Sequence, residues 1–93
     1  MGIKLNLNVI IRQDINEKLQ VGNVYPFSKD SLCVLADEMA IWLADKNWNA
    51  VAEIMVTSQQ RKSGITSGTF KVLYIYQKEE QEHLTKIFLR MYD

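Results

Sequence analysis

The sequence has very few of the residues on which small secreted or metal-binding domains depend: one cysteine, one histidine and one proline in 93 positions. A lone Cys33 cannot form an internal disulfide, and secreted domains of this size usually rely on several. We therefore predict a reducing, cytoplasmic setting. Cys33 and His83 supply only two of the four ligands of a structural zinc site, so we expect no metal site and no cofactor.

An excess of charge of one sign is also absent, because eleven Lys and Arg residues balance eleven Asp and Glu residues. Nucleic-acid binders usually carry a basic field, so nucleic acid is a disfavoured partner. The longest apolar run, near residues 39–44, is far shorter than the ~20 residues of a membrane span. The alternating N-terminus lacks the apolar core of a signal peptide. We expect no membrane contact.

Motifs for catalysis are missing as well. The chain contains no GxGxxG, P-loop, HExxH or CxxC pattern. A serine or cysteine nucleophile needs a base within hydrogen-bond reach, and His83 is the only imidazole, placed between Glu82 and Leu84 on a polar helix face. We therefore predict that the protein is not an enzyme.

What the sequence does contain is the composition of an ordinary globular chain, 47% hydrophobic and 24% charged. Ninety-three residues are enough for one core and too few for two. We expect residues 1–93 to form a single domain.

Four stretches have the composition of β-strands: residues 3–11, 19–27, 50–57 and 69–77. Pro26 cannot donate a ladder hydrogen bond, so the second of these either lies at a sheet edge or ends there; we favour the end. Residues 84–92 repeat apolar side chains at helical spacing, and Glu79 and Arg90 suit the helix dipole.

Residues 30–45 decide the predicted fold. Leu35, Met39 and Trp42 recur at helical steps, which favours a helix. This gives an α+β domain in the order ββαββα, with an antiparallel four-stranded sheet and two helices on one face. The helices would pack through six residues: Leu35, Met39, Trp42, Leu84, Phe88 and Met91. The alternative is a mostly-β barrel in which residues 32–44 are strands and only the C-terminal helix remains, because Ala40–Leu43 also reads as a buried strand.

Residues 58–68 have two glycines, three serines and little apolar content, which is typical of a mobile hairpin tip. Arg61 and Lys62 in this loop could clasp a phosphate. A weak nucleic-acid or phosphate binder that uses the 58–68 loop is therefore the alternative function.

The favoured function is a non-enzymatic interaction or adaptor domain. With both helices on one face of the sheet, five apolar side chains gather on the other face as a candidate interface: Ile10, Val24, Met55, Leu73 and Ile75. Trp48, in a polar turn, either anchors a partner or caps the core. We expect a protein partner or a homodimer on this face.

Overall fold

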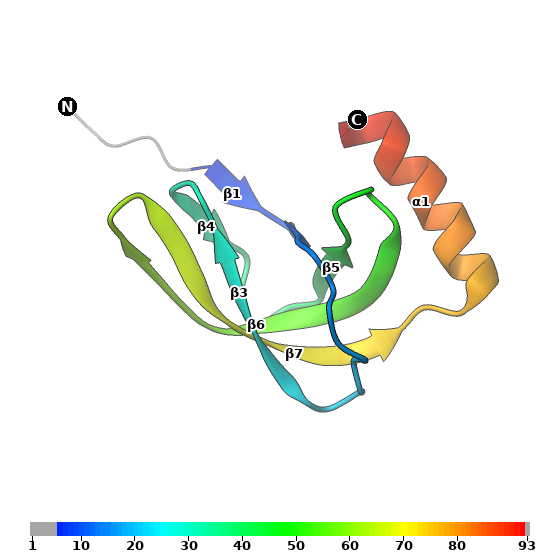
Figure 1. The fold of residues 1–93 in the computed structure, drawn as a ribbon, viewed down its shortest axis with the longest axis horizontal. Helices are drawn as coiled ribbons and strands as arrows, with labels where there is room; N and C mark the ends of the chain where they lie inside the picture. The colour runs from blue at the N-terminus through cyan, green and yellow to red at the C-terminus, as the bar shows by residue number, and fades with distance from the viewer. Residues whose placement is uncertain (1–5, 93) are drawn as a thin grey trace.

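The chain is built mainly from β-strands that curl into a half-barrel, with a helix at its C-terminal end (Figure 1). The computed structural model describes residues 6–92, so part of the predicted first strand, residues 3–5, lies outside them. The described elements are β1 (Asn6–Asn8), β2 (Ile10–Arg12), β3 (Val24–Lys29), β4 (Cys33–Leu35), β5 (Ile41–Ala44), β6 (Ala50–Lys62), β7 (Ile65–Ile75) and α1 (Lys78–Tyr92).

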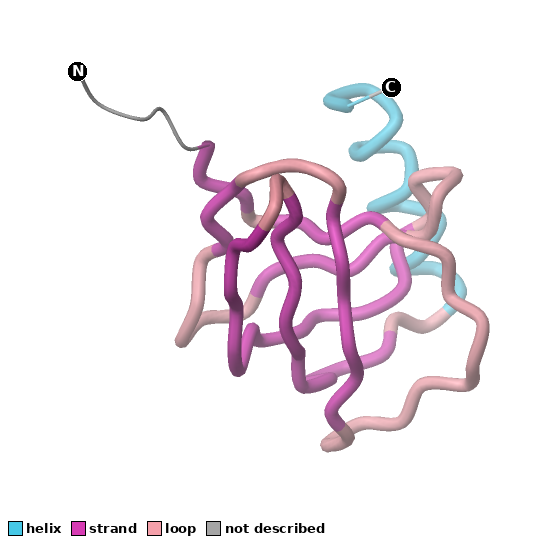
Figure 2. Tube along the Cα trace, turned by 60° about the vertical axis from the view of Figure 1, so that its left-hand side comes forward, coloured by secondary structure: helices cyan, strands magenta, loops and turns pink. Residues whose placement is uncertain are grey.

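Five strands form one mixed sheet in the order β2-β5-β6-β7-β3. β2 runs parallel to β5, whereas the other three pairs are antiparallel. β1 and β4 form a separate parallel pair. The strands wrap around a common interior, and α1 stands to one side (Figure 2).

The predicted helix at residues 30–45 is wrong, and with it the predicted two-helix, four-stranded fold. This segment forms β4 and β5, which bury alternate side chains such as Cys33, Leu35 and Leu43. Met39, predicted to be in the core, is 52% exposed in the connection between the two strands. The alternative barrel has these strands and the single helix, but the sheet remains open, with β2 and β3 at its edges.

The core consists of two clusters on opposite faces of the sheet. The larger lies inside the curl and includes Leu43, Ile54, Phe70 and Val72. The smaller lies between the sheet and α1, where Phe88 is 1% exposed. α1 lies where the apolar spacing predicts a helix, and a glutamate fixes its start: the Glu80 carboxylate accepts a hydrogen bond from the Gln77 backbone N–H at 2.9 Å.

Residues 58–68 are also not the long loop that their composition suggests. β6 and β7 continue through them to a tight turn at Ser63 and Gly64, whose φ angles are 55° and 78°. Positive φ at both positions is typical of type I′ hairpin turns. Further along β7, Gly68 is necessary because a Cβ there would overlap the backbone carbonyl of Ser58. The hairpin therefore curls by a close approach of two backbones.

Candidate functional site

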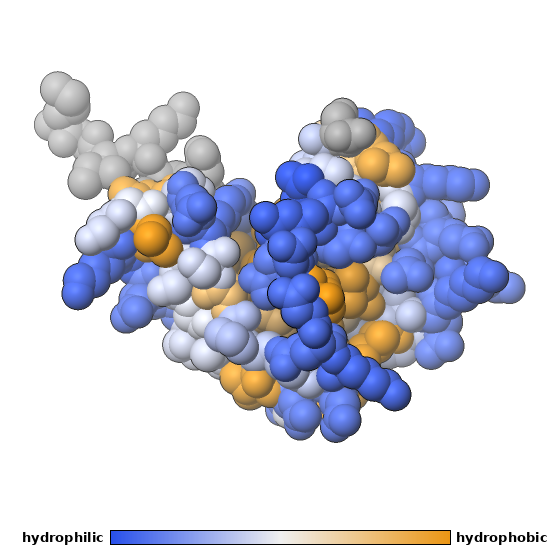
Figure 3. All heavy atoms as spheres, viewed as in Figure 1, coloured by the Kyte–Doolittle hydropathy of each residue, from blue (hydrophilic) through white to orange (hydrophobic). Residues whose placement is uncertain are grey.

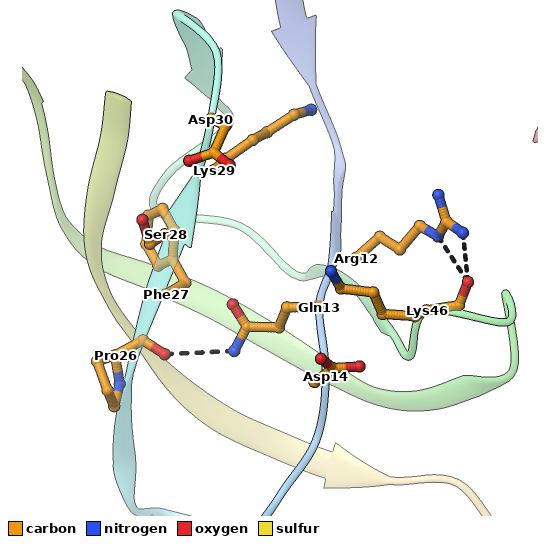
Figure 4. A pocket seen from close by; sticks show the side chains of 9 residues that line it. All are labelled: Arg12, Gln13, Asp14, Pro26, Phe27, Ser28, Lys29, Asp30 and Lys46. Carbon is orange, nitrogen blue, oxygen red and sulfur yellow. Dashed lines mark hydrogen bonds between the residues drawn. The ribbon is translucent and has the colours of Figure 1, made fainter. Parts of the chain in front are cut away.

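Two unpaired sheet edges face each other where the half-barrel fails to close. The strand pairings make β2 and β3 run in opposite directions. One hydrogen bond joins them: the side-chain amide of Gln13, just after β2, donates to the carbonyl of Pro26 on β3 at 3.3 Å (Figure 4). We call the space between these edges the seam groove.

The seam groove has a volume of about 480 Å³. It is lined by the residues that follow β2, by most of β3 and by the turn after β5: Arg12, Gln13, Asp14, Pro26, Phe27, Ser28, Lys29, Asp30 and Lys46. Phe27 is buried beneath it, whereas most of the other lining side chains are exposed. The groove thus has an apolar floor and a polar rim.

Pro26 lies at a position on β3 where the missing N–H of a proline costs no hydrogen bond between strands. In an antiparallel strand, the backbone groups of successive residues point alternately toward and away from the partner. The Pro26 carbonyl accepts a hydrogen bond from Gln13 in the seam groove, so it points away from β7. The Pro26 nitrogen points to the same side, and its missing N–H therefore removes no hydrogen bond from the β3–β7 ladder. The prediction that this strand ends at Pro26 is wrong, because β3 continues to Lys29 as an edge strand.

The rim of the groove carries charges of both signs. Arg12 is held by two hydrogen bonds to the Lys46 carbonyl, and its guanidinium carbon lies 4.5 Å from the centre of the Trp48 ring. In Figure 4 the Arg12 side chain points away from β3, toward the turn at Lys46. Lys29 and Asp30 occupy the opposite wall. The groove therefore offers a mixed polar rim rather than a basic surface.

The predicted interface residues separate in the structure. Ile10 packs against the helix-side cluster, and Ile75 packs against the inner cluster. Val24 and Met55 both pair in register with Lys71, and Leu73 follows two residues along β7. Val24 is 54% exposed. In the view of Figure 3 the hydrophobic surface forms small areas separated by hydrophilic side chains. The structure thus brings three of the five predicted residues, Val24, Met55 and Leu73, together next to Lys71.

Trp48 has a positive φ of 65° and is half-buried against the helix-side cluster. Its ring stacks on Tyr92 with centroids 5.0 Å apart and planes 11° apart. This packing places Trp48 as a cap on the core; its role as a partner anchor stays a prediction.

The two cations of the alternative function have different surroundings. Arg61 donates from Nε to the Cys33 carbonyl at 2.6 Å and from a terminal nitrogen to Gln59 Oε1 at 2.7 Å. Lys62 is exposed beside the turn. Arg61 therefore has a structural role, tying β4 to β6, and phosphate binding by Arg61 and Lys62 stays a prediction.

Two tyrosines near the start of α1 have perturbed acidity. The Tyr74 hydroxyl donates to Glu80 Oε1 at 2.6 Å, and this hydrogen bond is the main cause that raises the pKa of Tyr74 and lowers that of Glu80. Burial, followed by the charge of Glu53, raises the pKa of Tyr76 above its ordinary value. Both phenols therefore remain neutral hydrogen-bond donors at neutral pH.

Neither a metal-binding cluster nor a membrane-spanning helix is present within residues 6–92. No group of three or more His, Cys, Asp and Glu side chains converges there as metal ligands would. Within the same residues, α1 is too short and too polar to cross a bilayer.

The seam-groove residues were missed by the sequence analysis. Gln13, Asp14 and Ser28 belong to no motif, and they meet only because the sheet stays open. Pro26 was the one available signal, since a proline inside an extended segment indicates an edge.

Comparison with known proteins supports the fold alone. No family model matches the chain, and no curated protein matches its sequence. Among solved structures, the chain is similar to the protein ytmB from Bacillus subtilis, with a TM-score of 0.64 and 20% identity over 82% of this chain and 95% of that one. At this identity the similarity defines a shared half-barrel and carries no activity with it.

Proposed function

We propose that this chain is a non-enzymatic interaction domain that binds an extended segment of a protein partner in the seam groove. The observation that carries the proposal is the pair of unpaired edges joined by one side-chain hydrogen bond, from Gln13 to the Pro26 carbonyl. Unpaired strand edges are templates for an added strand. The buried free thiol of Cys33 is compatible with the reducing cytoplasm, which we include in the proposal.

The width of the groove supports this occupant. A glutamine side chain reaches roughly 5 Å and its hydrogen bond adds about 3 Å, so Gln13 spans a gap of up to roughly 8 Å, against the ~9.6 Å of two strand spacings. An added strand would therefore take the place of the Gln13 side chain and move the two edges slightly apart. Gln13 then acts as a placeholder, because its amide makes the hydrogen bond that a peptide backbone N–H would make with Pro26.

The test is a selection of binders from a displayed library of random twelve-residue peptides, followed by amide chemical-shift mapping. We expect shifts centred on residues 12–14 and 27–30, and loss of binding when alternate peptide amides are N-methylated. The Gln13→Ala variant should bind the peptides at least as tightly as the unmodified protein, since the Pro26 carbonyl is then free. Binders that shift only Val24, Met55 and Leu73, or failure to recover any binder, would overturn the proposal.

A further inference from the structure

Three residues with complementary chemistry lie side by side across β5, β6 and β7. Glu53 on β6 pairs in register with Trp42 on β5 and with Tyr74 on β7. Residues directly opposite in an antiparallel ladder project from the same face, with Cβ atoms ~4.5–5.5 Å apart. The Glu53 carboxylate is therefore flanked by an indole and a phenol.

Tyr76 adds a second phenol to this row. Its ring lies 5.8 Å from that of Tyr74, at an interplanar angle of 71°. The Tyr76 side chain is 9% exposed, and its hydroxyl is buried without a hydrogen-bond partner. A buried polar group without a partner costs free energy, so such groups are rare. Burial is the main cause that raises the pKa of Tyr76, and the negative charge of Glu53 adds to it.

The other carboxylate nearby is already occupied. Glu80 accepts hydrogen bonds from the Tyr74 hydroxyl and from the Gln77 N–H. Glu53, in contrast, forms no ion pair with any Lys or Arg in the part of the chain that the structure describes. Glu53 thus lies in a row of aromatic residues and has no ion-pair partner within residues 6–92.

The cluster packs against α1 on one side and is exposed to solvent on the other. Phe88 of α1 meets the Trp42 ring edge-on at 5.6 Å and fixes the indole against the helix. Tyr74 is 39% exposed, and Glu53 and Trp42 are half-buried. The Tyr74 side is therefore the side from which a small ligand can reach the cluster.

We propose that Trp42, Glu53, Tyr74 and Tyr76 form a binding site for a methylated ammonium group. Aromatic faces attract cations, and quaternary ammonium groups are the cations that aromatic cages recognise. A primary ammonium has three N–H donors to satisfy, whereas this site offers the Glu53 carboxylate alone, because the Tyr76 hydroxyl is buried. A methylated nitrogen needs no acceptors and loses less hydration on entering. The site shares no residue with the seam groove, so it stands or falls independently of the proposed function.

The test uses tetramethylammonium chloride as the probe, with binding followed by backbone amide and indole N–H chemical shifts. We expect saturable shifts at these four residues with a millimolar Kd, and no such shifts with sodium chloride or with 3,3-dimethyl-1-butanol, a neutral compound of similar shape. Glu53→Gln and Tyr74→Leu should each weaken binding about tenfold. Glu79→Gln, a carboxylate on the exposed first turn of α1, is the matched control and should leave Kd unchanged.

The affinities of choline and of a trimethyllysine peptide are then compared with that of tetramethylammonium. Tighter binding of choline identifies a small metabolite as the source of the methylated group, and tighter binding of the peptide identifies a modified protein. Absence of saturation up to about 100 mM in the folded protein would overturn the proposal. So would equal binding of the neutral alcohol, or an unchanged Kd in Glu53→Gln with its circular dichroism spectrum intact.

Discussion

The two halves of the β6–β7 hairpin are held in place by different kinds of interaction. The proximal half, residues 50–56 and 70–75, lies between the inner core and α1 and buries apolar side chains such as Ala52, Ile54 and Val72. The distal half, residues 57–69, is polar and reaches β4 through side chains. Gln59 both accepts from the Leu35 N–H and donates to the Leu35 carbonyl.

The distal half shows how polar side chains replace a backbone ladder. Buried backbone groups need partners, and the edge of β4 that faces the hairpin finds them in Gln59, Arg61 and Thr66. The buried Thr66 hydroxyl accepts from the Cys33 N–H at 3.1 Å and donates to the Ser31 carbonyl at 2.8 Å. One half is therefore stabilised by apolar burial, and the other by a few specific hydrogen bonds.

The largest effect that we expect is on the proximal side. Phe88→Ala removes a fully buried ring that joins α1 to the sheet, and should lower the free energy of unfolding by about 3–5 kcal/mol, because the cavity cannot be filled by the neighbouring strands. Urea denaturation measures this change. Leu89→Ala, at the exposed neighbouring position, is the control, and near-equal losses in the two variants would contradict the proposed importance of the helix-side cluster.

At the junction of the two halves, Gly68→Ala should lower the free energy of unfolding by about 3 kcal/mol. The new Cβ meets the backbone of Ser58, which is less able to shift than a side chain. Thermal unfolding of Gly68→Ala is compared with that of Gly64→Asn, whose position has open space and a left-handed backbone that asparagine tolerates. A stable Gly68→Ala protein would show that the close approach of the strands is not needed for the curl.

The same contrast explains how far the sequence predicts the fold. α1 and the core of β6 and β7 follow from local patterns, since helical spacing at residues 84–92 and alternation at 50–57 each fit one structure. Residues 30–45 fit two patterns, because Leu35, Met39 and Trp42 suit a helix while Leu35, Ile41 and Leu43 suit strands. Pairing with β1 and β2, more than twenty residues away, decides between them, and no local pattern contains that information.

The structure of the polar distal half and the existence of the seam groove could not be predicted from the sequence for a related reason. Gln59, Arg61 and Thr66 gave residues 58–68 the composition of a loop, but their polar groups serve β4 rather than solvent. The groove exists because β2 and β3 remain unpaired, which is a property of the whole sheet. The sequence could identify apolar candidates such as Ile75, but not which face each would occupy.

The third prediction tests the distal half directly. Thr66→Val keeps the shape of the side chain and leaves the Cys33 N–H and the Ser31 carbonyl without a partner, so we expect a loss of about 2 kcal/mol in the free energy of unfolding. Hydrogen exchange should also become faster at the Cys33 amide. Thr57→Val is the matched control: the Thr57 hydroxyl shares a solvent-exposed hydrogen bond with the Thr69 hydroxyl at 2.7 Å, which water can replace, so stability should change by less than ~0.5 kcal/mol. Equal effects of the two substitutions would remove the distinction between the halves.

The smallest effect that we expect is on the pH dependence of stability, and it arises at the start of α1, where the proximal half ends. The pKa of Glu80 is lowered from its ordinary value of 4.5, chiefly by the hydrogen bond from Tyr74. A carboxyl group whose folded pKa is lowered stabilises the folded state above its unfolded pKa, and this contribution is lost as the pH falls through the lower folded value. The melting temperature of the unmodified protein should therefore drop more steeply below pH 4.5 than that of Glu80→Gln, while the two curves stay parallel near neutral pH. Tyr74→Phe should remove most of the difference, because the Tyr74 hydroxyl is the chief cause of the lowered Glu80 pKa, and Glu79→Gln should remove none of it, because Glu79 is not among the causes of that shift. If all four proteins lose stability in parallel on acidification, the start of α1 owes nothing to this carboxylate, and apolar packing alone holds the proximal half.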